Sequence, residues 1–415
     1  DADARRLVVA FLSDRAAQDA YRAATLRHAP GTRLVFVAKT GTPEPAPADA
    51  EPSVYRVDGA DERALTRVLV AVAEAHGPVD ALHYLWPTER ADGRPPLREL
   101  ADVGVLVRAV AATGGTVPDV LVAGHYDDAV GQAALDALIG YERSLAGPLP
   151  GTALRVVLHE GAATAGRWAE LLLTEQRQEQ QAAALYRGGQ RHVCAVRSLP
   201  DAAAHAPGVL REGGTYLITG AFGGLGRRVA GHLARAYRAN LVLLGRSPLS
   251  PADETWAAGL GEHGGTVVCR RADVTDEDAL VEALSTLPPA LRAIDGVVHA
   301  AGTAQRLAVT EATREAARRV LAAKVDGTLA LERALDRTRA GRSAEFICLF
   351  SSSSATLGDF GSCDYAVANR FQSAYARALA ERGERRLLAV AWPLWEDGGM
   401  GAAAQRAADH DPVTA

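Results

Sequence analysis

A chain of 415 residues is too long for one ordinary hydrophobic core, so its length predicts two or more domains. Its net charge of -5, with both signs mixed along the sequence, argues against a nucleic-acid partner. No apolar run reaches the length of a membrane span and no signal peptide opens the chain, so we expect a cytoplasmic protein with no membrane partner. The first residue is Asp1 rather than Met, which suggests a piece of a longer polypeptide.

The four cysteines are scattered along the chain and have no spacing typical of a metal site. Reduced thiols in a cytosolic protein are the expectation, because such proteins rarely form disulfides. We therefore expect no metal. The four residues are Cys194, Cys269, Cys348 and Cys363.

The N-terminal half alternates short apolar segments with Ala- and Leu-rich helical segments. This alternation predicts parallel strands joined by helices, as in an α/β sheet. We expect strands at 6–12, 33–37, 81–86, 119–123 and 154–159, a helix at 60–75 and a Pro-rich loop at 42–50. A helical segment at 176–181, short strands at 185–186 and 192–196, and a linker at 200–208 complete this half.

This half has no phosphate-binding loop. Gly114 and Gly115 form an isolated pair without the third glycine that such a loop needs. We therefore expect a nucleotide-binding fold without the binding chemistry, serving as a structural support, because a fold alone does not give a function.

The second half opens on a strand that runs into a glycine-rich loop, with the sequence TYLITGAFGGLG at 215–226. Glycines there let the backbone turn tightly and approach a pyrophosphate at the start of the helix expected from Arg227. The match is more specific than a lone motif, because a strand precedes it and a second strand follows at 240–245. We expect a dinucleotide site at this loop.

The residues after the second strand select the cofactor. An NAD enzyme would usually carry Asp or Glu there for the ribose hydroxyls, whereas this chain has Arg246 and then Ser247. A guanidinium is a partner for a 2′-phosphate, so we expect NADPH. The alternative is a solvated surface arginine.

Later segments carry further cofactor candidates. Asp273 follows a third strand at 266–269 and suits the adenine amino group or, alternatively, a helix cap, for which Asp276 is the better candidate. A fourth strand contains His299, which we expect to be structural. The small residues after it would let the nicotinamide half of the cofactor lie close to the backbone. Lys324 lies on a helical segment whose neighbours are too apolar for a solvated lysine. The small residues are Ala300, Ala301 and Gly302.

The stretch at 350–369, FSSSSATLGDFGSCDYAVAN, holds a serine cluster followed by Tyr365 and Asn369. If the segment after Tyr365 is helical, Tyr365 and Asn369 share one face, one turn apart. A phenol and an amide facing serine hydroxyls suit the protonation and polarisation of a carbonyl oxygen. These groups do no redox chemistry alone, so a hydride source is needed, and the glycine loop offers a place for one.

Six motifs in this order, TGAFGGLG, GRS, ADVTD, HAAG, AAKVDG and FSSSS…DYAVAN, resemble the short-chain dehydrogenase/reductase family. Most reductases of that family carry Lys four residues after Tyr and Asn on the earlier helix. This chain has Asn369 after Tyr365 and Lys324 on the earlier helix, as is typical of ketoreductase domains of modular polyketide synthases. The segments SSSSATLGDFGSCDYAVANRFQ and WPLWEDGGM most resemble ketoreductases of trans-acyltransferase assembly lines.

The resemblance covers essentially the whole chain and implies an α/β fold of two Rossmann-like subdomains with parallel sheets. The N-terminal one, at 1–208, is expected to be truncated and cofactor-free, and the catalytic one to span 209–415. The implied function is NADPH-dependent reduction of a 3-ketoacyl thioester held on the phosphopantetheine arm of an acyl carrier protein, beside neighbouring synthase domains. Two alternatives stay open: a redox-inactive scaffold domain of such a synthase, and a free-standing reductase of small ketones.

The resemblance also implies roles for the site residues. Tyr365 would donate the proton, Lys324 would favour the phenolate and bond the nicotinamide ribose, and Ser352 would bond the substrate oxygen. Ser352 is chosen because it lies thirteen residues before Tyr365, the family spacing. Asn369 would hold Lys324 or a water in place. The expected cofactor contacts are Gly220, Phe222, Gly223, Gly224, Leu225, Gly226, Arg246, Ser247, Asp273, Val274, Ala300, Ala301, Gly302, Lys324, Tyr365, Pro393 and Leu394.

Product stereochemistry is predicted from two positions that differ from family markers. Members giving the D-hydroxy product usually carry an Asp shortly after the Ala-Ala-Gly motif, where this chain has Arg306. Members giving the L-hydroxy product often carry Trp eight residues before Tyr, where this chain has Leu357. The missing Asp favours the L-hydroxy product. We also expect Trp395 and residues 398–400 to begin a lid over the substrate.

Overall fold

The computed structural model describes residues 6–39, 54–58, 61–89, 96–114, 117–178, 182–196, 208–303, 307–384 and 386–395. Strands and helices alternate along these ranges in two mostly parallel sheets, which confirms the predicted α/β class. Within these ranges, no helix combines the length and the apolarity that crossing a bilayer requires. The expected loop at 42–50, most of the linker at 200–208 and the lid residues 398–400 lie outside the described residues.

The chain forms two compact units, and neither is one continuous stretch. Three of their boundaries fall inside helices, namely α10 (Arg314–Lys324), α12 (Ser354–Leu357) and α13 (Cys363–Glu381). The division of the sequence after residue 208 stays a prediction. Unit 1 contains Asp1–Val196, Gln305–Arg318 and Thr356–Val367, and unit 2 contains Arg197–Ala304, Arg319–Ala355 and Ala368–Ala415.

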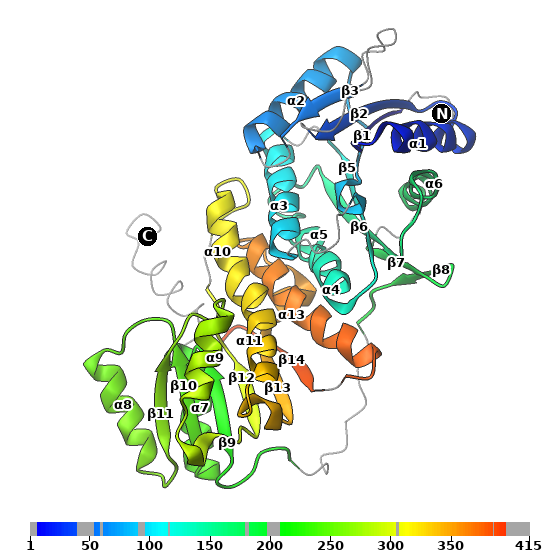
Figure 1. Ribbon diagram of the computed structural model, residues 1–415. Helices are drawn as coiled ribbons and strands as arrows, with labels where there is room; N and C mark the ends of the chain where they lie inside the picture. Colours follow the sequence, from blue (N-terminus) through cyan, green and yellow to red (C-terminus); the bar gives the residue numbers. More distant parts are fainter. Residues whose placement is uncertain are drawn as a thin grey trace, which may run out of the picture. The chain divides into compact units, whose positions relative to one another are not determined.

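The sheet of unit 1 has eight strands in the order β3-β2-β1-β4-β5-β6-β7-β8 (Figure 1). Strands β1 to β7 pair in parallel, as predicted. The four residues of β3 have no counterpart among the predicted strands, because they do not form an apolar run. The strands are β1 (Leu7–Phe11), β2 (Arg33–Lys39), β3 (Val54–Val57), β4 (Ala81–Tyr84), β5 (Asp119–Tyr126), β6 (Ala153–Glu160), β7 (Ala184–Arg187) and β8 (Gln190–Val193).

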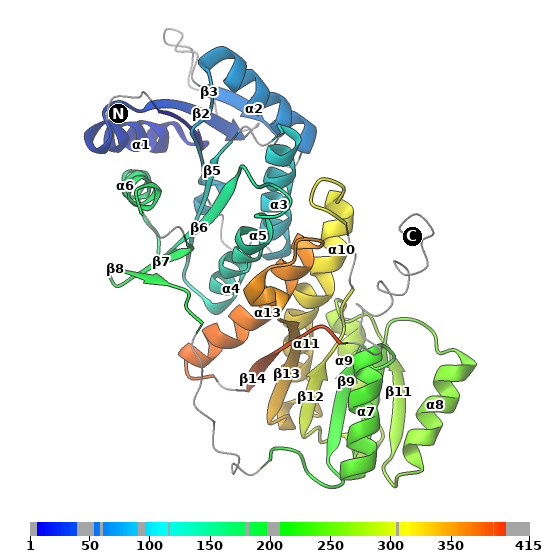
Figure 2. The same ribbon diagram turned by 180° about the vertical axis from the view of Figure 1, so that it is seen from behind.

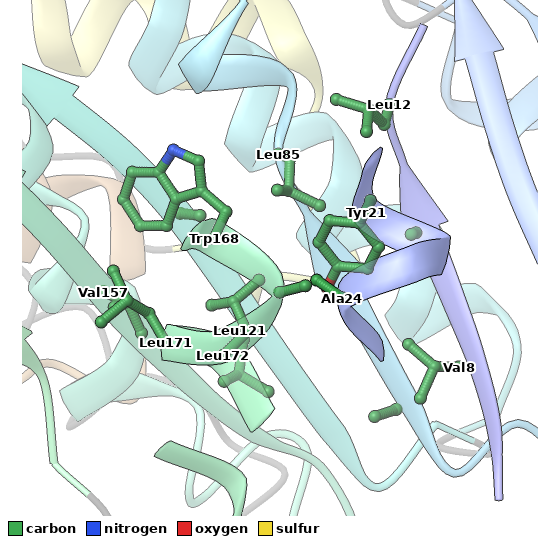
Figure 3. Packing of buried hydrophobic residues seen from close by; sticks show 14 of the residues in the cluster. Val8, Leu12, Tyr21, Ala24, Leu85, Leu121, Val157, Trp168, Leu171 and Leu172 are labelled. Carbon is green, nitrogen blue, oxygen red and sulfur yellow. The ribbon is translucent and has the colours of Figure 1, made fainter. Parts of the chain in front are cut away.

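Helices α1 and α6 pack together, and their buried faces complete a hydrophobic core (Figure 3). Tyr21 of α1 and Trp168 and Leu172 of α6 share this cluster with Leu121 of β5 and Val157 of β6. Burial of these large side chains supplies most of the stabilisation of such a layer. The helices before α7 are α1 (Arg15–His28), α2 (Glu62–His76), α3 (Pro96–Ala112), α4 (Ala129–Ala137), α5 (Ile139–Ser144) and α6 (Ala165–Gln176), with a 3-10 turn at Trp86–Thr88.

The predicted helical segment at 176–181 is wrong in its described part. Helix α6 ends at Gln176, and the amide of Arg177 already turns to the carbonyls of Thr174 and Glu175. The segment after Gln176 has no apolar side chain to bury, so nothing holds a further helical turn. Residues 179–181 lie outside the described residues.

The last two strands of unit 1 form a hairpin that departs from the predicted parallel arrangement. Strands β7 and β8 pair antiparallel, and β8 ends at Val193 rather than at Val196. The connecting residues Gly188 and Gly189 have φ values of +57° and +77°. Two residues in the left-handed region make the tight turn whose twist suits a hairpin, and glycine adopts it without strain.

The sheet of unit 2 has six parallel strands in the order β11-β10-β9-β12-β13-β14 (Figure 2). The order reverses between β9 and β12, and ligands of open α/β sheets bind at such a point, beyond the carboxyl ends of the strands. Right-handed crossovers put α7 and α8 on one face and α9 and α11 on the other, and each pair packs together. The strands are β9 (Thr215–Thr219), β10 (Asn240–Gly245), β11 (Val267–Arg271), β12 (Gly296–His299), β13 (Phe346–Ser352) and β14 (Leu387–Trp392); the further helices are α7 (Gly224–Tyr237), α8 (Pro251–Gly261), α9 (Glu277–Ser285), α11 (Asp326–Arg337) and α12 (Ser354–Leu357).

Candidate active site

Two glycines of the loop after β9 have no room for a side chain. Gly220 has a φ of +64°, and a Cβ on it would lie 2.7 Å from the backbone nitrogen of Ala301. A Cβ on Gly226 would lie 2.3 Å from the carbonyl oxygen of Gly220. Both distances are shorter than van der Waals contact allows, so only glycine fits. The loop therefore packs directly against the chain that leaves β12.

Helix α7 begins at this loop without a side-chain cap. Its N-cap residue is Gly223, which has no side chain to accept a hydrogen bond, and Gly223 and Gly224 are exposed. In six other helices an Asp, Ser or Thr side chain accepts a first-turn N–H group: α1, α2, α4, α6, α8 and α9. The first-turn N–H groups and the dipole of α7 therefore favour an anionic group such as a pyrophosphate.

Two guanidinium groups lie where β10 and β11 end. Arg246 is exposed directly after β10, and Arg271 ends β11 opposite Gly245 in the strand register. The Nε of Arg271 donates to the carbonyl of Arg246 at 3.2 Å. Both are charged partners for a phosphate group. Sequence analysis named Arg246 and not Arg271, because the strand register that brings the two residues together is not visible in the sequence.

An aromatic and ionic cluster ties the glycine loop to α8. The ring of Phe222 lies against Gly245, because a Cβ on Gly245 would lie 2.7 Å from a carbon of that ring. The same ring packs edge-on against Trp256, with 5.8 Å between the ring centroids. The guanidinium of Arg227 lies 4.4 Å from the centroid of Trp256 and donates to the carbonyl of Phe222 at 3.1 Å. Arg227 also pairs with Asp253 of α8. These contacts fix the shape of the loop from residues that the sequence motif does not include.

Asp273 and Asp276 take different roles after β11. Asp276 caps α9, as the sequence predicted. The Oδ1 atom of Asp273 accepts from the amide and the hydroxyl of Thr275, at 2.9 and 2.8 Å. The side chain of Val274 is buried against Gly327 of α11, where a Cβ would lie 2.9 Å from its Cγ1 atom. Contact of Asp273 or Val274 with the cofactor stays a prediction.

His299 is buried and hydrogen-bonded on both ring nitrogens, which confirms the structural role expected for it. Its Nε2 lies 3.2 Å from the carbonyl oxygen of Ala323, so Nε2 carries the proton. Its Nδ1 then accepts from the hydroxyl of Thr219 at 2.7 Å, and that hydroxyl oxygen accepts from the amide of Ala301 at 3.4 Å. Burial, followed by the charge of Lys324, lowers the pKa of His299 to about 3, so the ring stays neutral.

Lys324 ends α10 with its amine buried inside unit 2. Its Nζ donates to the carbonyl of Phe350 at 2.6 Å and to the Oε1 atom of Gln372 at 3.1 Å. The Nε2 of Gln372 donates to the hydroxyl of Thr328 at 3.2 Å, and that hydroxyl donates to the carbonyl of Lys324 at 2.6 Å. Burial lowers the pKa of Lys324 to about 7. A Cβ on Gly302 would lie 3.0 Å from its Cε atom, so the amine comes close to the chain after β12.

Gln372 is thus one residue that holds Lys324, and sequence analysis did not name it. Gln372 is fully buried and lies seven residues after Tyr365, which puts the two residues on one face of α13. This spacing is visible in the sequence, but the contact of Gln372 with Lys324 is not. Asn369 is also buried, and its backbone carbonyl oxygen accepts a hydrogen bond from the hydroxyl of Ser351 at 2.9 Å. The predicted role of Asn369, which is to hold Lys324 or a water in place, stays a prediction.

The serine cluster at the end of β13 separates into distinct environments. Ser351 is buried, and its hydroxyl donates a hydrogen bond to the backbone carbonyl of Asn369 in α13. Ser352 is half-buried, and its Oγ accepts from the amide of Ser354 at 3.2 Å. A hydroxyl that accepts there still has its own proton to donate. The choice of Ser352 as the substrate donor stays a prediction.

Tyr365 lies in the first turn of α13, half-buried, with its amide donating to the carbonyl of Ser362 at 3.1 Å. The helix is continuous from Tyr365 to Asn369, so the predicted shared face is present. Tyr365 packs with unit 1, whereas Ser352, Lys324 and Asn369 pack with unit 2. The catalytic roles of these four residues stay predictions.

The chain after β14 carries the last predicted contacts. Pro393 and Leu394 are exposed. The ring of Trp395 lies 5.3 Å from that of Trp392, and the guanidinium of Arg228 lies 5.9 Å from the Trp395 centroid. Arg306, the position used to predict stereochemistry, lies outside the described residues, as do residues 398–400 of the expected lid.

Comparison with known proteins identifies the family. Residues 214–397 match the family described as KR domain. Polyketide synthase PksM of Bacillus subtilis is 32% identical over 399 residues, which cover 95% of this chain and 9% of that protein. The chain therefore contains a KR domain at residues 214–397. KR stands for ketoreductase, and the KR domains of polyketide synthases are oxidoreductases that use a nicotinamide cofactor.

Two further comparisons agree with this assignment. Polyketide synthase ThaG of Burkholderia thailandensis is 34% identical over 414 residues, which cover 95% of this KR domain chain and 7% of ThaG. The chain thus spans less than a tenth of the length of these relatives. The solved structure described as the first ketoreductase of the tylosin polyketide synthase has a TM-score of 0.76 at 24% identity. It aligns with 95% of this chain and 81% of its own, which supports the fold.

The buried amine of Lys324 predicts a pH-dependent stability. In the folded protein it loses its proton near pH 7, whereas an unfolded chain keeps it to about pH 10.5. Between these values the unfolded state binds more protons, so the free energy of unfolding rises with pH. Relative to Lys324→Met, which has no amine, the wild type should gain up to about 1.4 kcal/mol per pH unit above about pH 7. Urea unfolding of both proteins across this range measures the difference, and parallel curves would contradict a lowered pKa.

Proposed function

We propose that this KR domain reduces the 3-keto group of an acyl thioester with NADPH. The observation that carries the proposal is the uncapped start of α7, where a glycine loop and two guanidinium groups offer donors to the phosphates of a dinucleotide. Arg246, with Arg271 beside it, suits the 2′-phosphate that distinguishes NADPH from NADH. The remaining cofactor contacts are proposed as the sequence motifs imply them.

The corresponding position in unit 1 supports a cofactor-free N-terminal subdomain. After β1 the chain enters α1 through Ser13 and Asp14, without glycines. Asp14 caps α1, and the carboxylate of Glu89 accepts from both the amide and the hydroxyl of Ser13. Two carboxylates at this helix start would repel a pyrophosphate. We therefore propose that unit 1 binds no dinucleotide.

The site residues have distinct proposed roles. The cofactor supplies a hydride to the keto carbon. Tyr365 donates its phenolic proton to the oxygen that becomes the hydroxyl, and because its ordinary pKa is near 10, it needs a nearby cation. Lys324 supplies that cation and bonds the nicotinamide ribose. Ser352 donates to the substrate oxygen as charge develops, a donor whose loss costs about 3 to 4 kcal/mol. Asn369 holds Lys324 or a water in place.

The substrate is proposed to arrive on the phosphopantetheine arm of an acyl carrier protein. PksM and ThaG are named as polyketide synthases and are many times longer than this chain, which supports neighbouring synthase domains as further partners. The place of action is proposed to be the cytoplasm. With Arg306 in place of the Asp marker, the L-hydroxy product is proposed. Chiral chromatography of the product tests this, and a dominant D-alcohol would contradict it.

Tyr365→Phe tests the reaction itself. The variant should fold and bind NADPH as the wild type does, but lose reduction of a 3-ketoacyl N-acetylcysteamine thioester, because only the proton donor is removed. Loss of NADPH absorbance measures turnover, and fluorescence of the bound cofactor measures its Kd. Turnover near that of the wild type would show that Tyr365 is not the acid. A wild type that binds no NADPH and reduces no thioester would favour the scaffold alternative.

Arg246→Ala tests the cofactor assignment. A charge-assisted bond to the 2′-phosphate is lost, so the Kd for NADPH should rise about tenfold or more while that for NADH hardly changes. Arg271→Ala should act in the same direction. The matched control is Arg15→Ala, which removes an exposed arginine of α1 and should leave both Kd values unchanged. Equal weakening of NADPH and NADH by Arg246→Ala would mean that Arg246 is structural.

Gln372→Leu tests how Lys324 is held. The variant removes one of the two acceptors of the amine, and we expect kcat to fall about tenfold, which is about 1.4 kcal/mol of barrier. Gln372→Glu keeps an acceptor oxygen beside the amine and should retain much more activity than the leucine variant. Steady-state kinetics on the same thioester measures both. Wild-type kcat in Gln372→Leu would mean that the carbonyl of Phe350 alone positions Lys324.

A further inference from the structure

Helix α5 of unit 1 holds the chain segment that carries Tyr365. This segment, Thr356–Val367, comes from late in the sequence but packs within unit 1. Gly140 of α5 lies against the backbone at its end, because a Cβ there would lie 2.7 Å from the nitrogen of Val367. Near its start, Gly358 has a φ of +86°, and a Cβ on it would lie 2.4 Å from the carbonyl oxygen of Arg143. Backbone therefore meets backbone near both ends of the segment.

Side chains of α5 bond the same segment at two points. The phenol of Tyr141 donates to Oδ1 of Asp364 at 2.6 Å, and Asp364 is the residue directly before Tyr365. The amide of Asp359 donates to the hydroxyl of Ser144 at 2.9 Å. Together with the close approach of Gly140, these bonds fix the first turn of α13 in place and orientation. The three α5 residues lie within five positions of one another, so one short helix supplies the whole set of contacts.

Tyr141 is itself rigidly held. Its side chain is buried, and a Cβ on Gly104 of α3 would lie 2.6 Å from its hydroxyl oxygen, so only glycine leaves room for the phenol. The neighbouring guanidinium of Arg108 is buried and pairs with Glu62 at 2.9 Å. Burial first, and then the charge of Asp364, raises the pKa of Tyr141 well above its usual value. The phenol therefore stays protonated and remains a donor.

We propose that α5 positions Tyr365 for proton donation, with Tyr141 and Asp364 as positioning residues. The inference rests on the proposed function, since it needs Tyr365 to be the proton donor. A general acid acts only within hydrogen-bond reach of its target, and a misplacement of about 1 Å costs on the order of 10²-fold in rate. Unit 1 then serves catalysis by holding the acid.

The test compares variants of the bond between Tyr141 and Asp364. Tyr141→Phe removes one hydroxyl, and Asp364→Ala removes its acceptor. We expect each to lower kcat about tenfold while the Kd for NADPH stays unchanged, because the glycine loop belongs to unit 2. The double variant should lose no more than either single one. Asp364→Asn keeps an acceptor oxygen and should restore most of kcat.

Tyr186→Phe is the matched control. The phenol of Tyr186 donates to Oε1 of Glu175 at 2.6 Å, a buried phenol–carboxylate bond of unit 1 outside the segment that carries Tyr365. This variant should lower the stability of the protein and leave kcat unchanged. An equal fall of kcat in Tyr186→Phe would trace the effect to general destabilisation and overturn the proposal. Wild-type kcat in Tyr141→Phe would overturn it as well.

Two further comparisons keep the outcomes separate. If Tyr141→Phe did not fold, Asp364→Ala and Asp364→Asn would decide, because equal kcat values for these two would contradict a positioning bond. Tyr365→Phe is measured in the same assay. Turnover near that of the wild type in that variant would show that Tyr365 is not the acid, whereas an inactive Tyr365→Phe beside a fully active Tyr141→Phe would overturn only the role of α5.

Discussion

The buried amine of Lys324 joins three segments of unit 2, which belong to α10, β13 and α13. An ammonium group removed from water needs acceptors, and it finds them in the carbonyl of Phe350 and the side-chain oxygen of Gln372. The end of α10, the end of β13 and the middle of α13 are thus fixed to one another. Ser352, two residues after Phe350, and Asn369, one turn before Gln372, take their positions from this arrangement. Burial of the cation weakens the fold near neutral pH, because burial disfavours the charged form of the amine.

Features that depend on local chemistry were predictable from the sequence. Strand β10 has the predicted bounds, because a run of branched apolar residues is bounded by a polar residue and a glycine. Asp276 caps α9 since a short carboxylate before a helix satisfies its first N–H groups. The uncapped start of α7 follows in the same way from Gly223. The hairpin of β7 and β8 was missed, although Gly188 and Gly189 carry a recognisable turn signal.

Features that depend on contacts between distant residues were not predictable. The pairing of β10 with β11 sets Arg271 beside Arg246, and only the register shows it. Gln372 shares a helical face with Tyr365, but the sequence does not say that a buried lysine reaches that face. The bond from Tyr141 to Asp364 joins residues 223 positions apart. Patterns of apolar and polar residues carry no information on such partners, because they report only which face of an element is buried.

The exchange of segments between the two units has a consequence for inheritance. The KR family match begins at residue 214 and includes Thr356–Val367, whereas α5 lies before it. A recombination event that moved only the matched region would give the segment with Tyr365 a foreign α5, with no assurance of a glycine at position 140 or a phenol at 141. Such a chimera would keep its own glycine loop and lose the native contacts around Tyr365. A transfer of this region between synthases, natural or engineered, should therefore include both halves of the chain together.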